Sequence, residues 1–73
     1  MTEIQIKLSP ESVSTFVKKT QDCDFNVDIA YDHLEIDAKS LLGILSLDLN
    51  KILHVKMFGH NEALEDYLQT LAV

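Results

Sequence analysis

Four stretches of the chain alternate between apolar and polar residues. In the first, Ile4, Ile6 and Leu8 fall on one side and polar residues fall on the other. A period of two is typical of a β-strand that buries one face. The pattern therefore predicts four strands, over residues 2–8, 25–31, 33–37 and 52–58.

Between the second and third stretches, only Asp32 and His33 are available for a turn. A two-residue hairpin loop requires positive φ angles, and Asp and His are among the few residues other than Gly that tolerate them. We therefore expect residues 25–31 and 33–37 to pair as an antiparallel hairpin.

Between the strands, the apolar residues recur at helical spacing. Ser9 followed by Pro10 and Glu11 is typical of a helix start, with Ser as the N-cap and Pro at the first helical position. Asn61 is placed to cap a last helix in the same way. The predicted buried stripes are Val13, Phe16, Val17 and Thr20 in the first helix, and Leu64, Tyr67, Leu68 and Leu71 in the last.

Residues 40–47 predict a short middle helix with two apolar sides. Ile44 and Leu47 lie on one side, and a second set lies on the other, formed by Leu41, Leu42 and Leu45. Both sides cannot face a single sheet, so we expect the three leucines to be exposed.

The order of elements is thus β-α-β-β-α-β-α. Four strands with one apolar face each, and helices with one stripe each, call for a two-layer α+β sandwich with an antiparallel sheet. A chain of 73 residues with 47% hydrophobic residues has room for one core. We expect a single domain over residues 1–73.

Charge and composition narrow the class of partner. Twelve acidic residues against six lysines give a net charge of -6, which disfavours nucleic acid and anionic lipid. No apolar stretch approaches the ~20 residues of a membrane span, and the N-terminus does not resemble a secretory signal. With one cysteine and hence no internal disulfide, we expect a cytoplasmic protein with no membrane insertion.

Candidate catalytic and metal-binding groups are sparse. His33, His54 and His60 do not have the spacing of metal ligands, so no metal site is expected. Cys23 lies between Asp22 and Asp24, and two carboxylates raise the pKa of a neighbouring thiol. The sequence does not predict an enzyme.

The segment Ala38-Lys39-Ser40, followed by six residues and Leu47, resembles the AKS stretch of HPr, the histidine-containing phosphocarrier of the bacterial sugar phosphotransferase system. Phe16-Val17-Lys18 resembles the FVK of its first helix, and Val55 and Gly59 fit its last strand and the loop after it. The resemblance implies an HPr-like open-faced sandwich with strand order 1-4-2-3 and three helices on one face.

The phosphocarrier motif itself is altered. In the family, strand one ends in H-x-R-P-A, where the His carries the phosphoryl group; here Ser9 stands at the His position, Glu11 at the Arg position and Ser12 at the Pro position. A phosphoserine is an ordinary ester and a poor donor, and Glu11 would repel an arriving phosphate. The resemblance thus implies an HPr-like protein without histidine phosphotransfer.

Ser40 corresponds to the regulatory serine that a dedicated kinase phosphorylates in some HPr proteins. The resemblance implies a regulatory or binding protein of sugar transport, without a cofactor, that meets proteins of the phosphotransferase or catabolite-control type as a monomer or weak dimer. The implied contact residues are Lys39, Leu41, Leu42 and Leu45. Taken without the resemblance, Ser40 is equally well explained as a plain helix cap.

Two alternatives remain open on the sequence. In the first alternative, the protein is an active phosphocarrier that uses another residue, such as His60 or His54. Otherwise it is a purely structural module that meets a partner, or itself, through the leucines and is never phosphorylated.

Overall fold

A computed structural model describes residues 1–73. Four strands form one antiparallel sheet in the order β1-β4-β2-β3, which confirms the predicted strand order and element order. The elements are β1 (Thr2–Ile6), a 3₁₀ turn η1 (Pro10–Ser12), α1 (Val13–Gln21), β2 (Val27–Tyr31), β3 (Leu34–Asp37), α2 (Leu41–Leu45), β4 (Leu53–Met57) and α3 (Glu62–Leu71).

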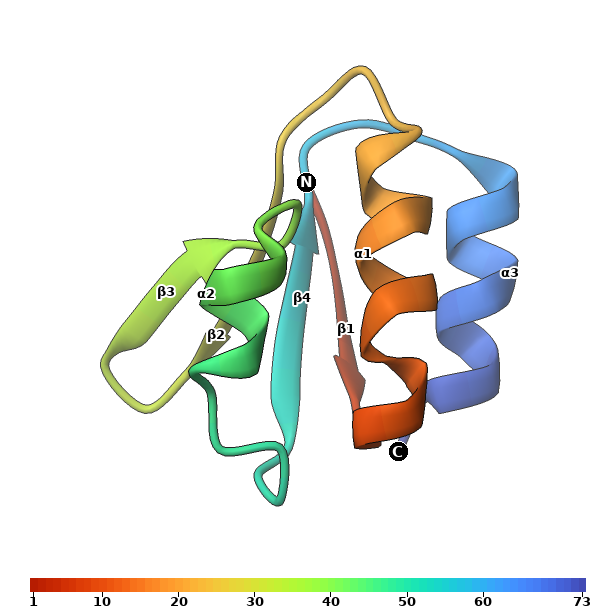
Figure 1. Cartoon of the computed structure of the whole chain (residues 1–73). Coiled ribbons are helices and arrows are strands. Elements are labelled where there is room, and N and C mark those ends of the chain that lie inside the picture. Colours follow the sequence, from red (N-terminus) through yellow and green to blue (C-terminus); the bar gives the residue numbers. More distant parts are fainter.

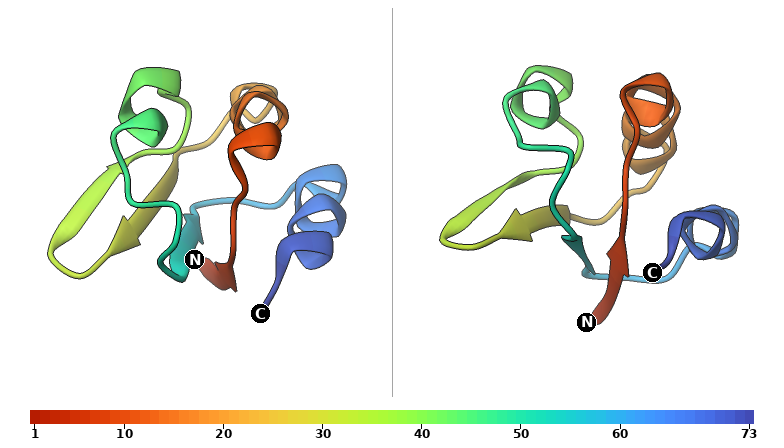
Figure 2. Two further views of the ribbon diagram at one scale, coloured as in Figure 1. Left: turned by 60° about the horizontal axis from the view of Figure 1, so that its bottom comes forward. Right: turned by 90° about the horizontal axis from the view of Figure 1, so that it is seen from below.

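The helices lie on one side of the sheet (Figures 1 and 2). Figure 2 shows α1 and α2 above the sheet, and α3 beside β1 on the same side as the other two helices. The opposite face of the sheet carries no element. The predicted open-faced α+β sandwich is therefore confirmed, and α2 is the helix that lies over the β2 and β3 end of the sheet.

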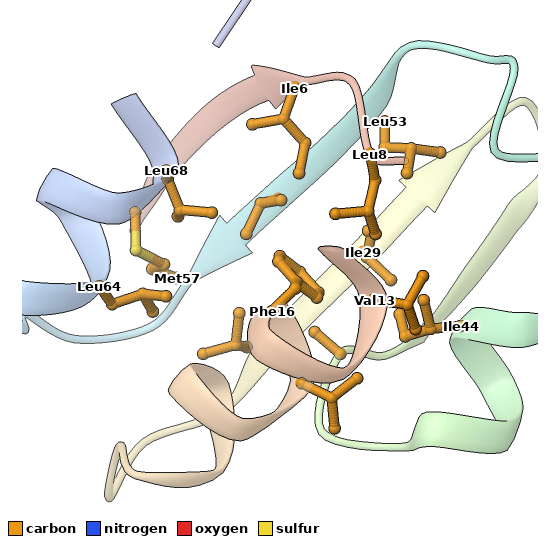
Figure 3. Close-up of a cluster of buried hydrophobic side chains, with 14 of the residues drawn as sticks. Ile6, Leu8, Val13, Phe16, Ile29, Ile44, Leu53, Met57, Leu64 and Leu68 are labelled. Carbon is orange, nitrogen blue, oxygen red and sulfur yellow. The ribbon is translucent and has the colours of Figure 1, made fainter. Parts of the chain in front are cut away.

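The core fills the space between the sheet and the helices (Figure 3). Phe16 of α1 lies among side chains from β1, β2 and β4 and is fully buried. The four predicted positions of the first helix, Val13, Phe16, Val17 and Thr20, are all buried. In α3, Leu64 and Leu68 are buried and the other two predicted stripe residues, Tyr67 and Leu71, are half-buried at its margin.

The β2–β3 hairpin turns at Asp32 and His33, as predicted. Only Asp32 has a positive φ, of 52°. An aspartate tolerates the left-handed region better than most residues because its short polar side chain can hydrogen-bond to nearby backbone. The Asp32 carboxylate also lies 3.5 Å from Nζ of Lys51.

Every predicted strand is one to two residues too long at one or both ends. Leu8 and Phe25 keep the alternating pattern but lie outside strands, because the chain leaves the sheet to enter or leave α1. The middle helix covers Leu41–Leu45 rather than residues 40–47, since Ser40 is its N-cap and Leu47 is buried just after it ends. Burial of a side chain thus extends beyond the hydrogen-bonded element.

The C-terminal residues cover the outer edge of β1, which the sequence did not predict. The amide of Lys7 donates to the carbonyl of Leu71, and the amide of Val73 donates to the carbonyl of Gln5, each at 3.1 Å. An antiparallel bridge joins Ile6 to Ala72. These contacts satisfy backbone groups that an edge strand would otherwise expose.

None of the helices is both long enough and apolar enough to cross a membrane.

Candidate functional site

Ser40 caps α2 with its side chain. Its backbone is extended, with φ -95° and ψ 109°, and Oγ accepts a hydrogen bond from the amide of Gly43 at 3.1 Å. The carbonyl of Ser40 accepts from the amide of Ile44, so the side chain and the backbone of Ser40 each bond one amide of the first turn. Ser40 is exposed. The predicted helix start at Ser40 is thus confirmed, with its hydroxyl at the surface.

Lys39 lies beside Ser40 but its ammonium group points elsewhere. Nζ donates to the carbonyl of Cys23 at 2.9 Å, near the end of α1. The carbonyl of Lys39 accepts from the side chain of Gln21, and its amide donates to the carboxylate of Asp37. Lys39 therefore fixes the segment before α2 to the end of α1. Its charge is near Ser40 in the chain, but it is held by a backbone oxygen.

The three leucines of α2 are exposed, as predicted. Leu42 is 81% exposed, Leu45 57% and Leu41 43%, whereas Ile44 of the same helix is fully buried. This unpaired apolar surface, here called the leucine face, adjoins Ser40 at the start of the helix. Exposed apolar side chains gathered on one short helix are typical of a protein contact surface.

Ser9 occupies the predicted position before the first helical turn, but its side chain does not cap it. Oγ makes no bond to a helix amide and lies 3.0 Å from Oγ of Ser12. The predicted capping role of the Ser9 side chain is therefore wrong, because its hydroxyl is bonded to that of Ser12 instead. Glu11 is exposed one residue before Ser12. The start of α1 thus carries two hydroxyls and a carboxylate close together in the chain.

A shallow hollow adjoins Ser9. It has a volume of about 630 Å³ and is lined by Lys7, Leu8, Ser9, Pro10, Leu49, Asn50, Thr70 and Leu71. The ammonium of Lys7 is already bonded to the carbonyl of Asn50 at 2.6 Å. The tertiary structure alone brings these segments together, and no residue of α2 lines the hollow.

The three histidines lie apart from one another. Nδ1 of His54 is 3.0 Å from the carboxylate of Glu3 on the open sheet face, and Nδ1 of His60 is 3.8 Å from that of Glu65. His33 is exposed in the hairpin turn. No group of three or more His, Cys, Asp or Glu side chains is placed to hold a metal ion.

The thiol of Cys23 is buried and in its ordinary protonated form at neutral pH. Burial raises the pKa of Cys23; the Lys39 charge lowers it, and the charges of Asp22 and Asp24 raise it again. The influence of Lys39 could not be read from the sequence, where the two residues are 16 positions apart. The net upward direction agrees with that expected from the two aspartates, and it argues against a reactive nucleophile.

Stability should fall as the pH rises into the alkaline range. Burial raises the pKa of Cys23 and of Tyr67, so in this range the folded state holds more protons than the unfolded chain, and the free energy of unfolding decreases as pH increases. The loss begins near the ordinary thiol pKa of about 8.5, and the tyrosine contributes only above about 10. Urea unfolding from pH 7 to pH 10 measures it. Cys23→Ala should flatten the slope between about pH 8 and 9.5, and an unchanged slope there would contradict this assignment.

Comparison with known proteins identifies the fold. No protein-family model matches the chain, and no curated protein matches it in sequence. Among solved structures, the chain is similar to HPr-C-His from Thermoanaerobacter tengcongensis, with a TM-score of 0.76 and 20% sequence identity over 96% of this chain and 93% of that one. Together with the strand order and the three helices on one face, this similarity shows that the chain has an HPr-like fold.

Proposed function

We propose that this protein is an HPr-like regulatory or binding protein that does not carry a phosphoryl group on histidine. It meets its partners through α2, with Ser40 as the site of regulatory phosphorylation and Lys39, Leu41, Leu42 and Leu45 as contact residues. The observation that carries the proposal is the exposed hydroxyl of Ser40 at the start of a helix whose three leucines are exposed.

The chemistry of the two helix starts supports this division. At the start of α1, Glu11 supplies a negative charge and Ser9 supplies a hydroxyl bonded to another hydroxyl. A relay requires a group that accepts and releases phosphate readily, together with a cation that stabilises the transfer. No imidazole is present there, and the ammonium of Lys7, which lines the hollow beside Ser9, is bonded to the carbonyl of Asn50. A phosphocarrier role in the manner of the family is therefore not part of the proposal.

Phosphorylation of Ser40 would change the leucine face electrostatically. A phosphate adds nearly two negative charges and three acceptor oxygens beside Leu41 and Leu42. The amide of Gly43 is already bonded to Oγ of Ser40, whereas the amides of Leu41 and Leu42 have no partner within the helix and are available to those oxygens. The contact surface would then combine an anion with apolar side chains, which favours a partner with a basic rim around an apolar centre.

Incubation with an HPr kinase and ATP tests the modification. We expect a mass increase of one phosphate in the wild type and in Ser46→Ala, and none in Ser40→Ala. Ser46 is the matched control because it is an exposed serine at the other end of α2. A mass increase that persists in Ser40→Ala, or no increase in the wild type, would contradict the proposal.

Two further measurements separate the alternatives. Incubation with phosphoenolpyruvate and enzyme I should leave no acid-labile phosphate, whereas a carrier that uses His54 or His60 would be labelled. The phosphorylated protein should bind a catabolite-control regulator, and Leu42→Glu should weaken that binding by about tenfold or more. Ile52→Glu is the control, since Ile52 is also exposed but is not in α2. Equal losses in the two variants would remove the leucine face from the proposal.

A further inference from the structure

The outer edge of β3 is the uncovered edge of the sheet. The other edge, on β1, is bonded to the C-terminal residues at Leu71 and Val73. β3 lies at the margin of the molecule, with no element beyond it (Figures 1 and 2). It covers only Leu34–Asp37, and three of its four residues are exposed.

The register of the hairpin shows which backbone groups point outward. The amide of Ala38 donates to the carbonyl of Val27 at 2.8 Å, and Ile29 lies opposite Ile36. Bonded pairs alternate with non-bonded pairs along an antiparallel ladder. Ile36 and Leu34 therefore direct their amides and carbonyls toward β2, while Glu35 and Asp37 direct theirs away. The carbonyl of Asp37 accepts from Ser40, which leaves both groups of Glu35 and the amide of Asp37 for an added strand.

The side chains of β3 divide by chemistry between the two faces of the sheet. Leu34 and Ile36 face the helix layer, and Leu34 is 50% exposed. Ile36 is covered by α2, because a Cβ on Gly43 of that helix would be 3.1 Å from the terminal methyl of Ile36. Glu35 and Asp37 lie on the open face. An added strand would thus meet apolar side chains on one side and carboxylates on the other.

The acidic row on the open face is only partly neutralised. Lys56 bonds Glu35 at 2.6 Å and lies directly opposite Asp28 of β2. On the other side of Asp28 lies Asp37, whose carboxylate accepts from the amide of Lys39 but forms no ion pair. Like charges opposite one another in a sheet are destabilising. A positive side chain next to Asp37 would offset that repulsion.

A second copy of the chain does not fit this edge. Residues opposite each other in a sheet lie on the same face, so antiparallel pairing of two β3 strands places Glu35 opposite Glu35, or Glu35 opposite Asp37. Each such register adds like charges in contact. The acidic residues thus act as a barrier to self-association at the edge.

We propose that the β3 edge accepts an extended segment of a different protein as a fifth strand. The segment alternates apolar residues, which pack beside Leu34 and Ile36, with lysine or arginine, which lie beside Glu35 and Asp37. Main-chain bonds to Glu35 and Asp37 supply the affinity, and the alternation supplies the specificity. This surface is separate from the phosphorylation of Ser40.

A short peptide of alternating lysine and valine is the probe. Added to the whole protein, it should shift the amide resonances of Glu35 and Asp37 and leave those of Glu3 and Gln5 on β1 unchanged. A peptide of the same composition with its lysines grouped together should bind about tenfold more weakly, because its charges cannot lie on one face. Equal binding of the two peptides, or shifts centred on β1 or α2, would overturn the proposal.

Two substitutions at Glu35 sharpen the test. Glu35→Pro removes an outward amide that the β2–β3 ladder does not use, so the domain should stay folded and lose the peptide. Glu35→Lys should weaken binding of the lysine–valine peptide by about tenfold and strengthen binding of a glutamate–valine peptide. Glu3→Lys is the matched control, since Glu3 is also exposed on the open face. Unchanged affinity in Glu35→Pro with a native spectrum, or dimerisation of the free protein through β3, would refute the inference.

Discussion

Replacing Phe16 with alanine should lower the free energy of unfolding by about 3 to 5 kcal/mol. The ring is fully buried at the centre of the core, between α1 and the sheet (Figure 3). Its removal forfeits transfer free energy and leaves a cavity that a close-packed interior fills only in part. A domain of 73 residues has a total stability of only about 4 to 11 kcal/mol, so a large fraction of it would be lost.

Thermal and urea unfolding followed by circular dichroism measure this effect. The melting temperature should fall by about 12 to 40 °C, at about 4 to 8 °C for each kcal/mol in a domain of this size. Phe58→Ala is the matched control: that ring is 50% exposed, and its removal should change stability by less than about 1 kcal/mol. If Phe16→Ala does not fold, Phe16→Leu should fold with a loss of about 1 to 2 kcal/mol. Similar losses in Phe16→Ala and Phe58→Ala would show that the core is centred elsewhere.

Gly59→Ala should destabilise the domain by about 1 to 3 kcal/mol through overlap with Phe25. A Cβ on Gly59 would lie 2.5 Å from Cγ of the Phe25 ring and closer still to Cδ2. Cγ is bonded directly to Cβ of Phe25, so rotation of the side chain moves it little, and relief of the overlap requires a shift of the segment between α1 and β2. The loop after β4 therefore requires a residue without a side chain.

The same substitution at Gly43 should have the opposite or no effect. A Cβ there would meet the terminal methyl of Ile36 at 3.1 Å and Oγ of Ser40 at 3.2 Å. Both atoms are at the ends of side chains and can move by a few tenths of an ångström, and alanine favours a helix by about 1 kcal/mol over glycine. In a double-mutant cycle, Phe25→Ala should cost less in Gly59→Ala than in the wild type, because the overlap has been removed. Additive effects in the cycle would show that Gly59 is required for another reason. Urea unfolding gives all of these free energies.

The contact between Gly59 and Phe25 also gives a structural reason for one feature of the resemblance. Gly59 is one of the residues on which that resemblance is based, and here the ring of Phe25 fills the space that a side chain at position 59 would occupy. A physical requirement at this position accounts for the glycine without any functional role. The same does not hold for Ser40, where a cap explains the hydroxyl but not the exposed leucines beside it.

Ser40 and Lys39 show where a prediction from sequence ends. The N-cap of α2 was predictable, because a serine before an apolar helical segment satisfies a free amide locally. The direction of the Lys39 side chain was not, because its partner, the carbonyl of Cys23, belongs to a segment 16 residues earlier. The predicted side-chain cap at Ser9 was wrong for a similar reason at short range. The Ser9 hydroxyl could bond either a helix amide or the hydroxyl of Ser12, and the sequence does not decide between these two partners.

The amino-acid sequence by itself determined the number and order of the strands and helices, the core residues of α1, and the exposure of the leucine face. Those features depend on the spacing of apolar residues along a single element, which is visible in the sequence. Only the tertiary structure decided that the C-terminus seals the edge of β1, that β3 stays open, and that Gly59 must make room for Phe25. Each of these depends on residues distant in sequence meeting in space, and the free energy of such a contact exists only once the chain has folded.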